Sequence, residues 1–191
     1  RVQARTFERL VTGQIRETVG PGPGDDPVGH YLEVLADKTG SLVATSARFG
    51  ASFAGVDAAL VESLTAFGEE VGVAFQISDD LLDIVSEAGA SGKAPGTDLR
   101  EGIATLPVLF ALGSDDPAEA RLRELVAAPV TDDAEHAEAL DLLRSSASLE
   151  RATGVLQEYA ERARARLTEV PAGDVREALS ALCDYVVTRT S

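Results

Sequence analysis

Three aspartates lie close together within an apolar segment of the sequence, FQISDDLLDI, residues 75–84. Asp79, Asp80 and Asp83 stand there among Phe, Ile and Leu residues. Unpaired charge is costly in such surroundings, and Mg²⁺ takes carboxylate oxygens together with phosphate oxygens and water. The segment therefore favours a magnesium and phosphate site over the plainer alternative, which is a solvated acidic stripe on a surface helix.

These side chains should share one face of a helix. At about 100° per residue, Gln76 falls on the same arc as the three aspartates. No proline interrupts residues 56–86, and apolar residues continue almost all round residues 71–84. That pattern is typical of a long helix enclosed by other helices. Gly68 and Gly72 lie near the edge of the arc, where we expect them to leave room for something bulky.

An Asp-Asp pair alone is weak evidence, because the chain has four of them. The other three lie at predicted helix starts, where a carboxylate caps free amide groups and suits the positive end of the helix dipole. The sequence predicts these further helices: one from Asp26 and Pro27 to about Thr39, one opened by Asp116 and Pro117 with Glu119 completing a capping box, one opened by Thr131 to Asp133, an Arg/Glu-rich helix within residues 148–170, and one from Asp174 to about Thr188. Residues 19–27 and 87–98 are predicted loops.

The composition indicates one helical domain. The chain has 191 residues, 45% of them hydrophobic, and no stretch alternates as a strand would, so we expect an all-α fold with its own core. A net charge of −15 argues against a nucleic-acid surface, which needs clustered Lys and Arg. The single cysteine, Cys183, cannot form an internal disulfide and favours a reducing, cytoplasmic location. No segment has the uncharged apolar length of a membrane-spanning helix.

The chain has only two lysines, Lys38 and Lys93, and each lies in a distinctive segment. Lys38 belongs to YLEVLADKTGSL, residues 31–42, and Lys93 to GKAPGTDLREGIATLP, residues 92–107. With DDLLD between them, these segments resemble in order and spacing the C-terminal half of the trans-isoprenyl diphosphate synthases, the polyprenyl synthetase family. The resemblance covers residues 31–112 well. It implies an all-α, isoprenoid-synthase-type helical bundle around a central cavity.

The resemblance also implies a prenyltransferase that lengthens an allylic diphosphate with isopentenyl diphosphate. Ionisation, condensation and loss of a proton would give a trans-polyprenyl diphosphate, and TDLREGIATLPVL is closer to synthases of medium and long chains. The expected Mg²⁺ ligands, or their close supports, match the family's second aspartate-rich motif: Asp79, Asp80 and Asp83. The residues expected to contact the diphosphate and serve catalysis also match the family: Lys38, Thr39, Gln76 and Lys93.

Two features depart from the family pattern. Ile103 stands where many members have a lysine, and the family's first aspartate-rich motif has no counterpart. We therefore interpret residues 1–191 as the C-terminal part of a single helical domain without its N-terminal half, inactive alone. Homodimers are common in the family and are expected here. A long-chain product would allow peripheral contact with a membrane, without insertion.

Three alternatives stay open. The first is a non-catalytic regulatory partner subunit of such a synthase, against which the intact diphosphate and metal positions argue. The second is a structural helical bundle with an acidic face, which predicts no dependence on Mg²⁺. The third is a terpene cyclase of the same fold, for which the Lys-Thr and Gly-Lys pairs are unexpected. His30 is interpreted as a structural residue at a helix start, and His136 as a structural residue that is exposed.

Overall fold

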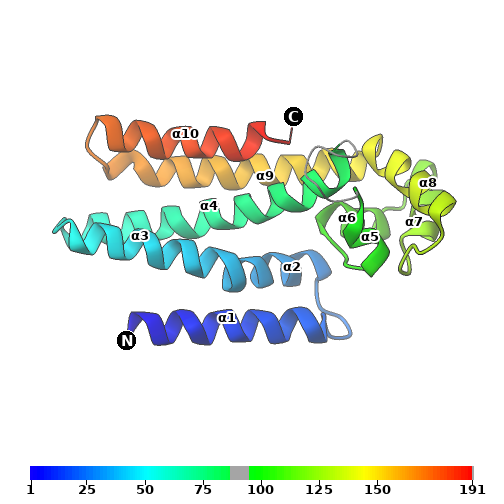
Figure 1. Ribbon diagram of the computed structural model, residues 1–191, viewed down its shortest axis with the longest axis horizontal. Coiled ribbons are helices and arrows are strands. Elements are labelled where there is room, and N and C mark those ends of the chain that lie inside the picture. Colours follow the sequence, from blue (N-terminus) through cyan, green and yellow to red (C-terminus); the bar gives the residue numbers. More distant parts are fainter. Residues whose placement is uncertain (87–94, 191) are drawn as a thin grey trace. The chain divides into compact units, whose positions relative to one another are not determined.

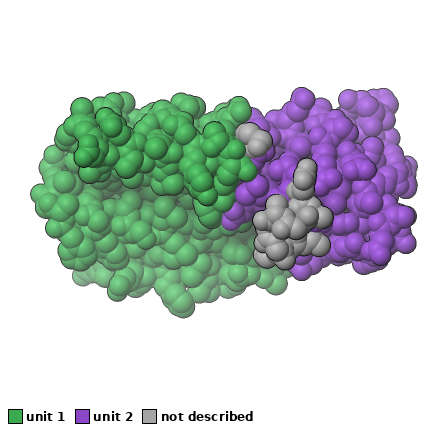
Figure 2. All heavy atoms as spheres, turned by 45° about the horizontal axis from the view of Figure 1, so that its top comes forward, with its two compact units in different colours: residues 1–76, 156–189, 191 green, residues 77–155, 190 purple. Residues whose placement is uncertain are grey.

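The computed structural model describes residues 1–86 and 95–190, and every regular element within these ranges is a helix (Figure 1). The all-α prediction is therefore confirmed. The described chain forms two compact units, which Figure 2 colours separately. The first unit contains residues 1–76 and 156–189, and the second contains residues 77–155 with Thr190. The single domain expected over residues 1–191 stays a prediction.

The first unit is built from the N-terminal helices and the C-terminal helix. Helix α1 packs against α2, a short π-helix and α3 (Figure 1). The Asp26 side chain accepts a hydrogen bond from the Val28 amide and caps α2, as predicted. The elements with residues in this unit are α1 (Val2–Val19), α2 (Pro27–Leu35), the π-helix η1 (Ala36–Gly40), α3 (Ser41–Phe53), α4 (Ala58–Val85), α9 (Ala147–Arg166), the 3₁₀ helix η3 (Leu167–Glu169) and α10 (Asp174–Thr188).

The second unit contains the end of α4, the start of α9 and the short helices between them. A buried apolar cluster of eleven residues, with Ile84, Leu122 and Leu143 among them, forms its core. Asp132 caps α8 by accepting hydrogen bonds from the Ala134 and Glu135 amides, again as predicted. The short helices are α5 (Thr97–Glu101), α6 (Leu106–Leu112), the 3₁₀ helix η2 (Pro117–Glu119), α7 (Ala120–Leu125) and α8 (Asp133–Arg144).

Helix α4 is the long helix predicted from the absence of proline, and it runs unbroken through 28 residues. Gly68 and Gly72 on this helix leave room for a neighbouring segment of the chain. A Cβ on Gly72 would lie 2.9 Å from the Cα of Gly40, and one on Gly68 would lie 2.8 Å from the Cα of Ala44. Both glycines therefore let a neighbouring backbone approach α4 closely. The room expected beside them is filled by helix backbone.

Three local predictions are wrong. The helix opened by Asp26 does not end near Thr39 but continues through η1 into α3. Glu119 does not complete a capping box, because its carboxylate accepts hydrogen bonds from the amide and hydroxyl of Ser148 instead. His136 is buried, not exposed, and its Nε2 lies 2.8 Å from the Gly96 carbonyl oxygen.

The single cysteine and the hydropathy of the helices are the remaining features of the fold. Cys183 is fully buried, and burial raises the pKa of its thiol above the usual value. Within the described ranges, no helix combines the length and the hydropathy needed to cross a membrane.

Candidate functional site

Lys38 and Thr39 lie in the five-residue π-helix η1, Ala36–Gly40, called the π-turn below. A π-helical turn shifts the backbone hydrogen bonds by one residue, and such turns are frequent at functional sites. Ser41 supplies two bonds here. Its amide donates to the Ala36 carbonyl, and its hydroxyl donates to the Asp37 carbonyl at 2.6 Å. The backbone carbonyls at the start of the π-turn are thereby satisfied.

Thr39 and Gln76, predicted together as diphosphate-binding residues, are brought into contact. The Thr39 hydroxyl donates a hydrogen bond to the Gln76 side-chain oxygen at 3.2 Å, across from the π-turn to α4. The close approach of Gly40 to α4 makes this contact possible, since a Cβ on Gly40 would lie 3.2 Å from the Glu69 carbonyl oxygen. Both side chains are partly exposed. The two therefore form one polar surface of the first unit.

Lys38 makes an ion pair that the sequence did not indicate. Its ammonium group donates to the Glu17 carboxylate of α1 at 2.5 Å, and Gln14 donates to the same carboxylate oxygen at 2.9 Å. The Lys38 side chain keeps 27% of its surface exposed, and that of Glu17 keeps 43%. Pairs this exposed are weak in water, so an anion with more charge than one carboxylate could compete for the lysine.

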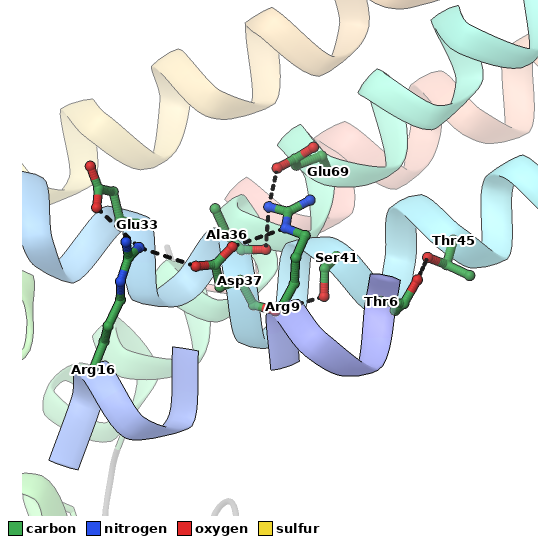
Figure 3. A network of polar contacts seen from close by, with 9 residues as sticks. All are labelled: Thr6, Arg9, Arg16, Glu33, Ala36, Asp37, Ser41, Thr45 and Glu69. Carbon is green, nitrogen blue, oxygen red and sulfur yellow. Dashed lines mark hydrogen bonds and ion pairs between the residues drawn. The ribbon is translucent and has the colours of Figure 1, made fainter. Parts of the chain in front are cut away.

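Asp37, next to Lys38, is held by two arginines of α1 (Figure 3). Arg9 donates through Nε at 2.9 Å to one of its oxygens, and Arg16 donates at 3.2 Å to the other. Arg9 also donates to the Ala36 carbonyl at 3.3 Å and to the Glu69 carboxylate of α4 at 2.6 Å. Burial lowers the pKa of Arg9, but its hydrogen bonds to Glu69 and Asp37 outweigh burial and raise that pKa above the usual value. Sequence reasoning missed this network because its partners lie far apart in the chain.

The three aspartates on α4 belong to the second unit and are less buried than their apolar neighbours. Asp79, Asp80 and Asp83 are all partly exposed, whereas the adjoining Ile77 and Leu81 are buried. Carboxylates in this position are hard oxygen donors, so their chemistry fits a Mg²⁺ ion. Among the described residues, no three acidic, His or Cys side chains already converge as a metal-binding group.

Asp83 supports the chain that follows the acidic motif. Its two carboxylate oxygens accept hydrogen bonds from the Thr97 amide at 3.3 Å and the Asp98 amide at 3.1 Å, and its carbonyl accepts from the Gly96 amide at 2.7 Å. These bonds satisfy amide groups at the start of α5, which otherwise lack partners. Asp83 thus ties the end of α4 to the start of α5, and its role toward a metal ion stays a prediction.

Gly96 is fixed from the other side by His136. The left-handed φ of +73° at Gly96 suits glycine, and a Cβ there would lie 2.6 Å from the His136 Nε2. The remaining predicted diphosphate residue, Lys93, lies outside the described residues.

Comparison with known proteins identifies the class. The family model for polyprenyl synthetase matches residues 1–143, and the chain therefore belongs to the polyprenyl synthetase family. A relative from Mycobacterium tuberculosis, nonaprenyl diphosphate synthase, is 51% identical over 99% of this chain and 56% of its own length. A second one from the same organism, dimethylallyltranstransferase, is 41% identical over 98% of this chain and 56% of its own length.

A solved structure gives the same assignment of fold. Geranylgeranyl pyrophosphate synthase from Corynebacterium glutamicum, complexed with calcium and isoprenyl diphosphate, superposes with a TM-score of 0.91 and 43% sequence identity. The match covers 99% of this chain and 59% of that protein. The chain thus spans little more than half the length of the relatives it resembles.

Proposed function

We propose that this chain belongs to a trans-polyprenyl diphosphate synthase, which lengthens an allylic diphosphate with isopentenyl diphosphate. The observation that carries the proposal is the hydrogen bond between Thr39 and Gln76, directly beside Lys38. It brings Thr39 and Gln76 together within one unit, with Lys38 next to Thr39 in the chain, in a family whose known members act on prenyl diphosphates. The activity concerns the whole natural protein, and the inactivity of residues 1–191 alone stays a prediction.

The residues divide the chemistry in the following way. Lys38, Thr39 and Gln76, with Lys93, bind the diphosphate of the allylic substrate through charge and hydrogen bonds. Asp79 and Asp80, supported by Asp83, hold Mg²⁺. When bound, Mg²⁺ supplies positive charge that stabilises the departing diphosphate.

The reaction breaks the bond between the allylic carbon and the diphosphate oxygen, and the electron pair leaves with the diphosphate. The double bond of isopentenyl diphosphate then forms a carbon–carbon bond to the allylic cation, and loss of a proton restores a double bond. Positive groups that are already fixed in place before the reaction lower the activation barrier most, because they stabilise the negative charge that develops on the diphosphate without having to reorganise. Lys38 on the braced π-turn fits that role.

Further properties follow from the same proposal. The 51% identity to a nonaprenyl diphosphate synthase supports a product of medium or long chain. A homodimer is proposed because members of the family commonly form homodimers. Helix α1 has an exposed apolar stripe that could pack against a second copy: Phe7, Val11, Ile15 and Val19. A cytoplasmic location and peripheral membrane contact through a long product complete the proposal.

The proposal is tested with the full-length natural protein, an allylic diphosphate, radiolabelled isopentenyl diphosphate and Mg²⁺. Wild type should transfer label into a prenyl chain, whose length chromatography measures. Asp79→Ala should lower kcat by about 100-fold, the scale of losing one group that stabilises charge. Asp115→Ala is the matched control, because it removes an exposed carboxylate from a different Asp-Asp pair.

Calorimetry provides a second, independent readout. Mg²⁺ should bind weakly alone and much more tightly with inorganic diphosphate, since carboxylates alone leave the ion largely hydrated. Tight Mg²⁺ binding that is indifferent to diphosphate would contradict the proposed site. Absence of prenyl transfer by wild type, together with no diphosphate binding, would instead support a non-catalytic partner subunit.

A further inference from the structure

Arg9 joins three elements of the first unit through one guanidinium group (Figure 3). It extends from α1, bonds the side chain of Asp37 in the π-turn, and bonds the carboxylate of Glu69 on α4 at 2.6 Å. Its third bond, at 3.3 Å, goes to the Ala36 carbonyl. The Asp37 side chain is only 16% exposed, whereas the side chains of Arg9 and Glu69 are each 38% exposed, so the bond to Asp37 is the better shielded of the two ion pairs. Arginine suits such a place, because its planar fork can serve several acceptors in fixed directions.

The backbone of α1 also lies against the π-turn. A Cβ on Gly13, one turn after Arg9, would lie 2.8 Å from the Cβ of Asp37 and 3.1 Å from the amide nitrogen of Lys38. Arg16 follows on the same face of α1 and bonds the second oxygen of Asp37. One face of α1 therefore fits the π-turn closely, while Phe7 and Ile15 on the opposite face are exposed.

The π-turn needs such external support more than an ordinary helical turn does. Runs of π-helix are rare and mostly limited to single turns within α-helices. Lys38 and Thr39 follow Asp37 directly, so any shift of Asp37 moves both of them relative to Gln76. A displacement of about 1 Å in a positioning element can cost an enzyme about 100-fold in rate.

We propose that Arg9 is a positioning residue for diphosphate binding: by linking Asp37 to Glu69, it fixes the π-turn against α4 and so sets the place of Lys38 and Thr39 beside Gln76. Arg9 acts through the π-turn and is not a ligand of the substrate. The proposal rests on the proposed function, since it assumes that Lys38 and Thr39 bind a diphosphate.

The test measures binding of inorganic diphosphate in the presence of Mg²⁺ by calorimetry, on the full-length natural protein. Arg9→Gln should weaken binding about tenfold, equivalent to about 1.4 kcal/mol, and should raise the KM of the allylic diphosphate more than it lowers kcat. The matched control is Arg48→Gln. Arg48 bonds both carboxylate oxygens of Glu62 and joins α3 to α4, but it has no bond to the π-turn. This control should bind diphosphate within about twofold of wild type.

A double-mutant cycle separates positioning from general damage. Because Arg9 is proposed to place Lys38 as well as Thr39, Arg9→Gln should weaken diphosphate binding less once Lys38→Ala is present, since coupled residues are not additive. Arg9→Lys serves as a second variant that retains the charge and folds more readily. A lysine cannot span Asp37 and Glu69 with one planar fork, so its binding should be intermediate between wild type and Arg9→Gln.

Several results would overturn the inference. One is an equal loss of binding from Arg9→Gln with and without Lys38→Ala, and another is wild-type binding by Arg9→Lys. If Arg48→Gln lost as much diphosphate binding as Arg9→Gln, and the two variants lost thermal stability to the same extent, Arg9 would have only a general structural role. Failure of the proposed function gives a different pattern, in which Lys38→Ala itself leaves diphosphate binding and prenyl transfer unchanged.

Discussion

Lys38 and Glu17 form an ion pair of 2.5 Å between the π-turn and α1. The lysine that the family resemblance predicts to bind a diphosphate is thus held by a carboxylate from another helix. A diphosphate that binds Lys38 competes with Glu17 for the same ammonium group. We therefore expect Glu17 to lower the affinity of Lys38 for a diphosphate.

Removing the competing charge should strengthen binding. In Glu17→Gln, inorganic diphosphate with Mg²⁺ should bind about two- to fivefold more tightly, because a pair this exposed contributes at most about 1 kcal/mol. Isothermal calorimetry measures the change. Glu8→Gln is the control, since it removes an exposed carboxylate from the same helix. Unchanged or weaker binding in Glu17→Gln alone would mean that Glu17 helps to orient Lys38 rather than competing for it.

The close contact between α4 and the π-turn predicts a loss of stability on adding one methyl group. Gly72→Ala would place its Cβ 2.9 Å from the Gly40 Cα and 3.1 Å from the Val43 Cβ. Overpacking of this kind costs about 1–3 kcal/mol, more than the roughly 0.5–1 kcal/mol that alanine gains over glycine in a helix. Chemical denaturation should therefore show a lower free energy of unfolding for Gly72→Ala.

Gly154→Ala is the matched control for that measurement. Gly154 lies within α9, and nothing lies within 4 Å of the position that its Cβ would take. This variant should raise the free energy of unfolding by about 0.5–1 kcal/mol. Equal effects of the two substitutions would show that α4 and the π-turn are less closely packed than described.

Local sequence patterns predicted local structure well. The proline-free segment gave α4 to within two residues at its start, and Asp26 and Asp132 cap the helices they were expected to cap. Such features depend on neighbours in the chain, which a sequence displays directly. The likeness of the DDLLD, Lys-Thr and Gly-Lys segments to one family likewise identified the class of protein.

Contacts between distant residues could not be predicted in the same way. Glu17 lies 21 residues before Lys38, and Arg9 lies 60 residues before Glu69. The occupant of the space beside the glycines of α4 could not be predicted for the same reason, because the sequence does not say which backbone will lie there. Nothing around His136 in the sequence points to Gly96, its hydrogen-bond partner 40 residues away.

Glu119 should make the stability of the protein depend on pH. Burial raises the pKa of its carboxyl, but hydrogen bonds from Ser114 and Ser148 and the charge of Arg151 together lower it below the usual value. A carboxylate with a lowered folded-state pKa stabilises the fold fully above its unfolded pKa, and this stabilisation is lost as the pH falls through the folded pKa. The free energy of unfolding should therefore fall below about pH 4.5.

Denaturation of Glu119→Gln across the acid range tests this dependence. The variant should be less stable than wild type at neutral pH, and the difference between the two should shrink as the pH falls. Because other carboxylates titrate in the same range, only the difference between variant and wild type is informative. A constant difference from neutral to acid pH would contradict the proposed role of the Glu119 charge.

Asp79 and Asp83 should differ in what their removal costs, although both belong to the same acidic motif. Asp83→Ala deletes the acceptor for the Thr97 and Asp98 amides, a loss comparable to that of a helix cap, about 0.5–2 kcal/mol. Asp83→Ala also removes the repulsion between the two aspartates, which lie four residues apart on α4, but this raises the free energy of unfolding by only about 0.2–0.5 kcal/mol. Asp83→Ala should therefore lower the free energy of unfolding as well as prenyl transfer.

Two further variants serve as comparisons. Asp83→Asn keeps an acceptor oxygen and should restore much of the stability without restoring the activity. Asp79→Ala should lose activity, while its free energy of unfolding stays level or rises. Denaturation and prenyl-transfer assays on the same preparations decide the matter, and an Asp83→Ala variant as stable as wild type would show that its bonds to α5 contribute little.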